Sequence, residues 1–76
     1  MTVETGPALT TQDGQVMQTL VFNPADEGNW DITAYGEETD AEGNRYYLTF
    51  SLSTPTKAER DKYLPALIAI VAAYHK

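Results

Sequence analysis

Side chains that could perform catalysis are few in this chain and poorly placed. There is no cysteine, and the one histidine, His75, is the penultimate residue, where chain ends fray. Neither a cysteine–histidine pair nor a multi-histidine metal site can therefore form. Ser51 and Ser53 lack the flanking glycines of a nucleophile elbow. We expect no enzyme activity, no catalytic residue, no metal ion and no cofactor.

Carboxylates are the chemical group that the sequence concentrates. Four fall within six residues, at Glu37, Glu38, Asp40 and Glu42, and Asp31 lies on the strand before them. Such a run most often forms a solvated turn. It also complements a basic surface, so these five residues are candidates for partner binding. Asp40 and Glu42 alternate as calcium ligands do, but the loop glycine is misplaced and the distal acid is missing.

Two tyrosines, Tyr35 and Tyr47, are the second kind of candidate. The strand pattern puts both on the outer face of a sheet, where polar and aromatic residues are normal even without a partner. Tyrosine is also favoured at protein interfaces, so both are candidate recognition residues. Aromatic rings on a sheet can stack nucleobases as well, but such platforms carry a basic track that this sheet lacks.

The charge distribution favours a protein partner over nucleic acid. The formal net charge is −6. Residues 1–56 hold nine acids and one base, Arg45, whereas residues 57–76 hold four bases and two acids. The acidic part disfavours direct contact with phosphates and favours a partner with a basic surface.

The length of 76 residues predicts a single domain spanning residues 1–76. A domain this small buries only about 60% of its unfolded surface, so a homodimer is an open alternative. The start of the chain lacks the features of a signal peptide, and the absence of cysteine suits a reducing compartment. The apolar run Leu64–Tyr74 is about half the length of a membrane span. We expect a cytoplasmic protein that does not contact membranes.

Three predicted turns determine where the candidate carboxylates and tyrosines lie in the sheet. Asp13-Gly14 suits a two-residue hairpin turn, and the strings ending at Gly28 and Gly43 each suit a three-residue loop. These loops predict Ile32 opposite both Leu52 and Phe22. They agree on one apolar inner face, formed by Leu9, Val16, Leu20, Phe22, Trp30, Ile32, Ala34, Tyr46, Leu48, Phe50 and Leu52. The predicted outer face holds Met17, Thr19, Val21, Asp31, Thr33, Tyr35, Tyr47, Thr49 and Ser51.

A C-terminal helix is predicted over residues 56–75. Thr56 and Glu59 form a capping box, and Pro65 predicts a bend or a second helical start. Apolar residues at helical spacing predict burial along much of the circumference. Those residues are Tyr63, Leu64, Leu67, Ile68, Ile70, Val71 and Tyr74.

The predicted fold is α+β: a four-stranded antiparallel β-meander over residues 8–52, with the proline-bent helix packed on one face and residues 1–7 loose or at an edge. With the junction Leu52–Pro55, this order of elements resembles the PC4-like family, whose members bind single-stranded DNA and dimerise. The lysine-rich strands of that family are absent here. The preferred hypothesis is a non-catalytic protein-interaction module, such as a small phage-type inhibitor that occupies a basic surface. A single-stranded nucleic-acid-binding domain and a subunit of a homo-oligomer are the alternatives.

Overall fold

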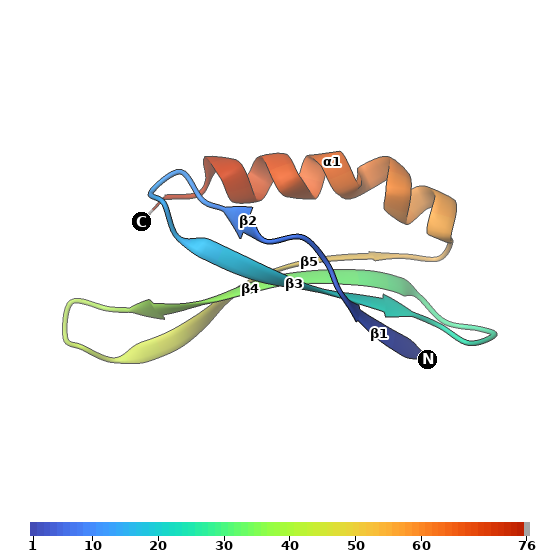
Figure 1. Cartoon of the computed structure of the whole chain (residues 1–76), viewed down its shortest axis with the longest axis horizontal. Helices are drawn as coiled ribbons and strands as arrows, with labels where there is room; N and C mark the ends of the chain where they lie inside the picture. The colour runs from blue at the N-terminus through green and yellow to red at the C-terminus, as the bar shows by residue number, and fades with distance from the viewer. Residues whose placement is uncertain (76) are drawn as a thin grey trace.

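In the computed structural model, which describes residues 1–75, an antiparallel sheet carries one helix on one face (Figure 1). The strands are β1 (Thr2–Thr5), β2 (Leu9–Thr10), β3 (Val16–Asn23), β4 (Trp30–Thr39) and β5 (Arg45–Thr54), and the helix is α1 (Lys57–Ala73). Strands β1 and β2 pair in succession with one edge of β3, and the strand order is β1-β3-β4-β5. The predicted α+β fold is confirmed, and the N-terminal segment supplies an edge strand.

The β4–β5 hairpin has the predicted register. Ile32 lies opposite Leu52 and Ala34 opposite Phe50. The hairpin closes through a three-residue loop, in which the Asp40 amide donates to the Asn44 carbonyl at 2.9 Å. Gly43 adopts a φ of 87°, the left-handed conformation expected for the last residue of such a loop.

Replacing Gly43 with alanine should lower the free energy of unfolding by about 1 kcal/mol, because a Cβ atom is strained at this φ. A Cβ atom there would meet no other atom within 4 Å, so the cost is one of backbone conformation alone. Asparagine tolerates the left-handed region better, so Gly43→Asn should cost less. Urea unfolding of the two variants measures the difference. Equal stability of the two would contradict the assigned loop conformation.

The predicted register of β3 against β4 is wrong by one residue. Ile32 lies opposite Val21 rather than Phe22, and Ala34 lies opposite Thr19 rather than Leu20. The cause is that β3 ends at Asn23 and β4 begins at Trp30, so the connection has six residues rather than the three assumed.

The predicted two-residue turn before β3 is also wrong. The Thr11 amide donates to the Gln15 carbonyl at 2.9 Å, which encloses a three-residue loop that ends at Gly14 with a φ of 87°. The loops before and after β3 each shift its pairing by one residue from the predicted register. The two shifts compensate each other, so β3 alone presents its side chains to the opposite faces from those predicted, while its neighbours keep theirs. Its Met17, Thr19 and Val21 therefore face the helix. The residues expected to be buried, Val16, Leu20 and Phe22, lie on the opposite face of the sheet.

Helix α1 begins where the sequence predicts and runs continuously through Pro65. The Thr56 side chain accepts a hydrogen bond from the Glu59 amide at 3.1 Å, so Thr56 is the N-cap. Figure 1 shows the first turns inclined relative to the rest of the helix. At the other end, the Gln12 amide donates to the Tyr74 carbonyl at 2.8 Å and holds the β2–β3 loop against the helix.

The buried stripe of the helix is narrower than predicted. Its buried residues are Arg60, Leu67 and Val71. In contrast, Tyr63, Ile68 and Ile70 are 47%, 39% and 56% exposed, because one small sheet covers a single side of the helix. Apolar side chains on both flanks of the helix are therefore left in solvent.

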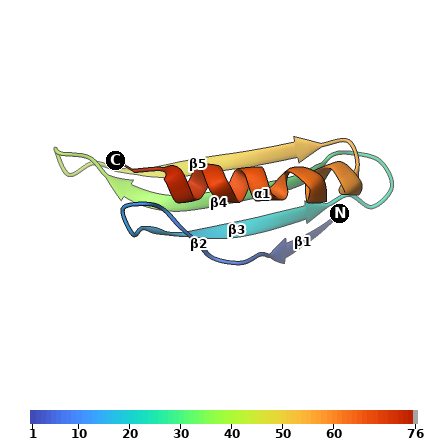
Figure 2. The same cartoon turned by 90° about the horizontal axis from the view of Figure 1, so that it is seen from above.

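The core between helix and sheet is small. It consists of Met17, Ile32, Ala34, Leu67 and Val71. Figure 2 shows the helix lying along the sheet above β4, with β5 on one side and β3 on the other. Within residues 1–75, no helix combines the length and apolar character needed to cross a bilayer.

Candidate functional site

The sheet face opposite α1, which we call the open face, is covered by no element among residues 1–75 (Figure 1). The pairing register places four rows of side chains on it. The apolar and aromatic members come from β1, β3, β4 and β5. They are Val3, Val16, Leu20, Phe22, Tyr35 and Tyr47. This band is more apolar than predicted, because the inversion of β3 delivers Val16, Leu20 and Phe22 to it.

The centre of the open face is a shallow hollow of about 380 Å³, lined by Leu20, Tyr35, Tyr47 and Thr49. We call these four residues the tyrosine patch. Tyr35 pairs directly with Thr49 across β4 and β5, and the Tyr47 side chain is the most exposed aromatic group near it, at 71%. Two rings beside an aliphatic side chain and a hydroxyl can bury apolar area while keeping hydrogen-bonding groups at the rim.

An ion pair lies at one end of the tyrosine patch. Glu37 pairs with Tyr47 in the β4–β5 register, and its carboxylate accepts from Arg45 Nε at 3.3 Å. The Gln15 side chain donates to the Glu37 carbonyl at 2.8 Å, which fixes the β4 backbone here. Both charged side chains are well exposed, so the ion pair contributes little to stability. It leaves both charges accessible to a partner.

The acidic run is divided by the structure. Glu37 lies on the open face, whereas Glu38 is on the helix side, opposite Tyr46, and only 8% exposed. Asp40 organises the hairpin tip, where one of its oxygens accepts from the amides of Glu42 and Asn44 at 2.9 Å each. Glu37 and Glu42 are thus the two exposed acids of this run.

The candidates Tyr35 and Asp31, both on β4, are also separated by the structure. Tyr35 belongs to the tyrosine patch, whereas Asp31 lies on the open face at its far end, opposite Phe22 and Ser53. One oxygen of Asp31 is buried without a hydrogen-bond partner. Of the carboxylates on β4, Asp31 and Glu37 therefore flank the tyrosine patch at its two ends, and the acids of this strand do not form one cluster.

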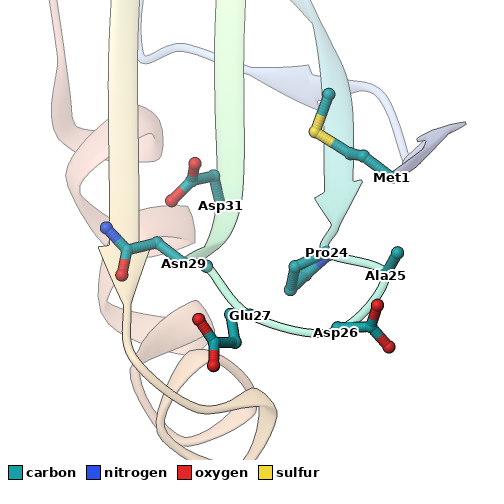
Figure 3. A pocket seen from close by; sticks show the side chains of 8 residues that line it. Met1, Pro24, Ala25, Asp26, Glu27, Asn29 and Asp31 are labelled. Carbon is teal, nitrogen blue, oxygen red and sulfur yellow. The ribbon is translucent and has the colours of Figure 1, made fainter.

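A larger hollow of about 800 Å³ lies beside the β3–β4 loop, lined by Met1, Asp31 and residues 24–29. Figure 3 shows that the carboxylates of Asp26, Glu27 and Asp31 point in different directions rather than converging. Among residues 1–75, no group of three or more histidine, cysteine or acidic side chains is arranged to hold a metal ion. The hollow therefore offers no assembled cation site.

Sequence reasoning missed three members of the open face, Val16, Leu20 and Phe22. The sequence did show that the assignment of β3 was ambiguous. Both faces of this strand are largely apolar, so the alternation of its residues did not favour burial of either face. It also missed Arg60, which lies under the helix. Arg60 Nη1 donates to Asn23 Oδ1 at 2.8 Å, and the guanidinium lies 5.2 Å from the centroid of the Trp30 ring.

The arrangement provides an exposed apolar and aromatic surface with charge at its ends. Comparison with known proteins adds no identity to this description, because no protein family, no curated protein and no solved structure matches the chain.

Proposed function

We propose that this protein is a cytoplasmic, non-catalytic interaction module that binds a partner protein through its open face. The observation that carries the proposal is the uncovered tyrosine patch together with Val16 and Phe22. A sheet in a small domain normally exposes a polar outer face, whereas this one presents several apolar and aromatic side chains around the tyrosine patch. Contact with a partner would remove these side chains from water.

The charges around the band favour a partner that is apolar at its centre and basic at its rim. Glu37 and Glu42 lie toward one end of the open face, and Asp26, Glu27 and Asp31 toward the other (Figures 1 and 3). Complementary charge at the rim speeds encounter, while buried aromatic groups supply most of the affinity. A nucleic-acid-binding protein whose basic surface is occupied by this acidic domain is one concrete case.

The nucleic-acid alternative is less favoured. Tyr35 and Tyr47 could stack bases, but Arg45 is the one basic side chain of the open face within residues 1–75, and it is paired with Glu37. Strand recognition without sequence preference requires a positive groove along the backbone.

The test is a photo-crosslinking amino acid at position 47, used in an extract of the cells that make the protein, with position 68 on the helix as control. We expect a crosslinked protein at position 47 alone. Leu20→Glu should then weaken binding of that purified partner about tenfold or more, because it charges the centre of the interface. Ile68→Glu, an equally drastic change away from the open face, should leave the affinity unchanged.

Neutralising the exposed acids with Glu37→Gln and Glu42→Gln should reduce both the association rate and its salt dependence. Asp40 is left intact because it holds the turn. Unchanged salt dependence would contradict the basic-rim partner. A single-stranded oligonucleotide that binds at low salt and is released by Tyr47→Ala would favour the nucleic-acid alternative instead.

A further inference from the structure

The two edges of the sheet differ in a way that indicates a second interface. One edge is broken into β1, of four residues, and β2, of two, with Gly6 and Pro7 between them. Short, interrupted strands protect an edge from pairing with other chains. The other edge is β5, ten residues long and paired to β4 without a bulge. No strand among residues 1–75 pairs with its outer side.

Strand β5 also lacks the usual protective devices. From Tyr46 to Thr54 it contains no proline, no glycine and no charged residue. Its residues are mostly aromatic, aliphatic and hydroxyl-bearing, which favours β structure. A long, uncharged edge of this kind is a template for another strand.

The core is incompletely covered on the same side of the molecule. The inner-face residues of β5, Leu48, Phe50 and Leu52, are only half-buried, whereas Ile32 and Ala34 on β4 are buried. Tyr46, at the start of this row, is 41% exposed. Apolar surface therefore continues from the core over the β5 edge.

The helix adds an apolar flank above this edge. The Tyr74 ring packs edge to face on Phe50 with centroids 5.6 Å apart, which identifies the side of the helix that faces β5. At about 100° per residue, Tyr63, Ile70, Glu59 and Ala66 lie next on that side, while Ile68 lies on the opposite flank. Tyr63 and Ile70 are about half exposed. We define the β5 side as the free edge of β5 with Tyr46, Leu48, Phe50, Leu52, Tyr63, Ala66 and Ile70.

We propose that the β5 side binds a second copy of this chain, with the two β5 strands pairing antiparallel about a twofold axis near Thr49 and Phe50. An axis normal to the sheet keeps both helices on the same face of one continuous sheet. It places the half-buried row of each copy against that of the other. The interface is isologous, as closed dimers require.

The charge distribution favours a second copy of this chain as the partner of the β5 side. Each copy carries a net charge of −6, so two copies repel through most of their surfaces. The β5 side is much less charged, because no residue between Tyr46 and Thr54, nor Tyr63, Ala66 or Ile70, carries a formal charge at neutral pH. Glu59, in the first turn of α1, is the one acid on this flank of the described helix.

The dimensions are sufficient. The β5 side is one of the two broad sides of the molecule, whose extents are 44 × 21 × 16 Å. The part along β5 and α1 offers on the order of 600 Å² per copy, so two copies reach the ~1,200 Å² at the lower end of stable interfaces. With α1 above β4 (Figure 2), the two helices would lie about three strand spacings apart, or ~14 Å, a gap that Tyr63 and Ile70 of both copies can fill.

The test uses two matched substitutions on one helix. Ile70→Glu charges the β5 side, whereas Ile68→Glu charges the opposite flank; both side chains are exposed, and circular dichroism checks that both variants fold. We expect sedimentation to give a dimer for the unmodified chain and for Ile68→Glu, and at least a tenfold weaker dimer for Ile70→Glu. Hydrogen exchange should show β5 amides whose protection rises with concentration.

Three results would overturn the proposal. The first is an unmodified chain that stays monomeric up to about 1 mM. The second is equal dissociation by Ile68→Glu and Ile70→Glu. The third is a dimer that Leu20→Glu dissociates while Ile70→Glu does not, because that dimer would use the open face.

Discussion

Shortening Met17 to alanine should lower the free energy of unfolding by about 2–5 kcal/mol, whereas Leu20→Ala should lower it by about 1 kcal/mol or less. Met17 is fully buried within the core beneath α1, so its truncation leaves a cavity. Leu20 lies on the open face, where solvent reaches the site. A domain of this length is stable by roughly 4–11 kcal/mol, so the Met17 variant would lose a large part of its stability.

Urea unfolding of the two variants measures this difference under identical conditions. The comparison tests the register because Met17 and Leu20 lie on the same strand but face opposite sides of the sheet. If Leu20→Ala proved the more damaging, β3 would have the register in which Leu20 faces the helix. A third variant, Val21→Ala, provides a control, since Val21 packs against the core from the same face as Met17. Val21→Ala should therefore lower the free energy of unfolding by more than Leu20→Ala does.

The reason that the sequence predicted β5 correctly and β3 wrongly lies in the loops. The β4–β5 loop is short, and Asp40 and Gly43 allow one turn geometry that fixes the register locally. The β3–β4 connection is longer, and its Gly28 has a φ of 130° outside such a turn, so it leaves the register to tertiary contacts. Turn chemistry alone cannot decide that case.

The tertiary contacts that decide the register of β3 involve distant residues. Gly36 lies beside the Gln15 and Met17 side chains, where an added Cβ would come within 2.9 Å of Gln15 Nε2 and 3.3 Å of Met17, so a glycine at 36 makes room for both. Thr19 is buried on the same face, and its hydroxyl donates to the Pro7 carbonyl at 2.7 Å. This bond offsets the cost of burying a hydroxyl. Neither contact can be predicted from the alternation of apolar and polar residues within β3.

The candidate site was predictable in part for the same reason. Tyr35 and Tyr47 were placed on the open face correctly, since both belong to the hairpin whose register the turn fixes. Leu20 was placed on the wrong face with its strand. Arg60 was missed because a charged side chain is expected in solvent. Its position four residues before Leu64 nevertheless puts it on the buried stripe.

Replacing Arg60 with alanine should lower the free energy of unfolding by about 2–4 kcal/mol, because it leaves a partly buried acceptor without its donor and removes packing between the helix and the sheet. The Arg60 side chain is only 9% exposed. It donates to Asn23 at 2.8 Å and lies over the Trp30 ring, so it joins the helix to both β3 and β4. Its 3.5 Å contact with the exposed Asp61 carboxylate compensates little of its burial.

Two controls separate this role from a general effect of charge. Lys62→Ala removes a cation from the same helix that lies 5.5 Å from the Tyr63 ring on the exposed side, and should change stability by less than about 0.5 kcal/mol. Arg60→Lys keeps the charge but loses the planar group, so it should still destabilise the domain. Trp30 is the one tryptophan of the chain, so its fluorescence in the folded state reports the loss of the guanidinium directly.

A double-mutant cycle with Asn23→Ala gives the decisive measurement. If Arg60 stabilises the fold through Asn23, the two substitutions should be non-additive by about 0.5–3 kcal/mol. Full additivity, together with an Arg60→Ala variant no less stable than Lys62→Ala, would show that the helix does not depend on this bond. Non-additivity would identify a buried arginine as the link that orients α1 over the sheet. That orientation leaves the flank with Tyr63 and Ile70 beside β5, so loosening it should also weaken self-association.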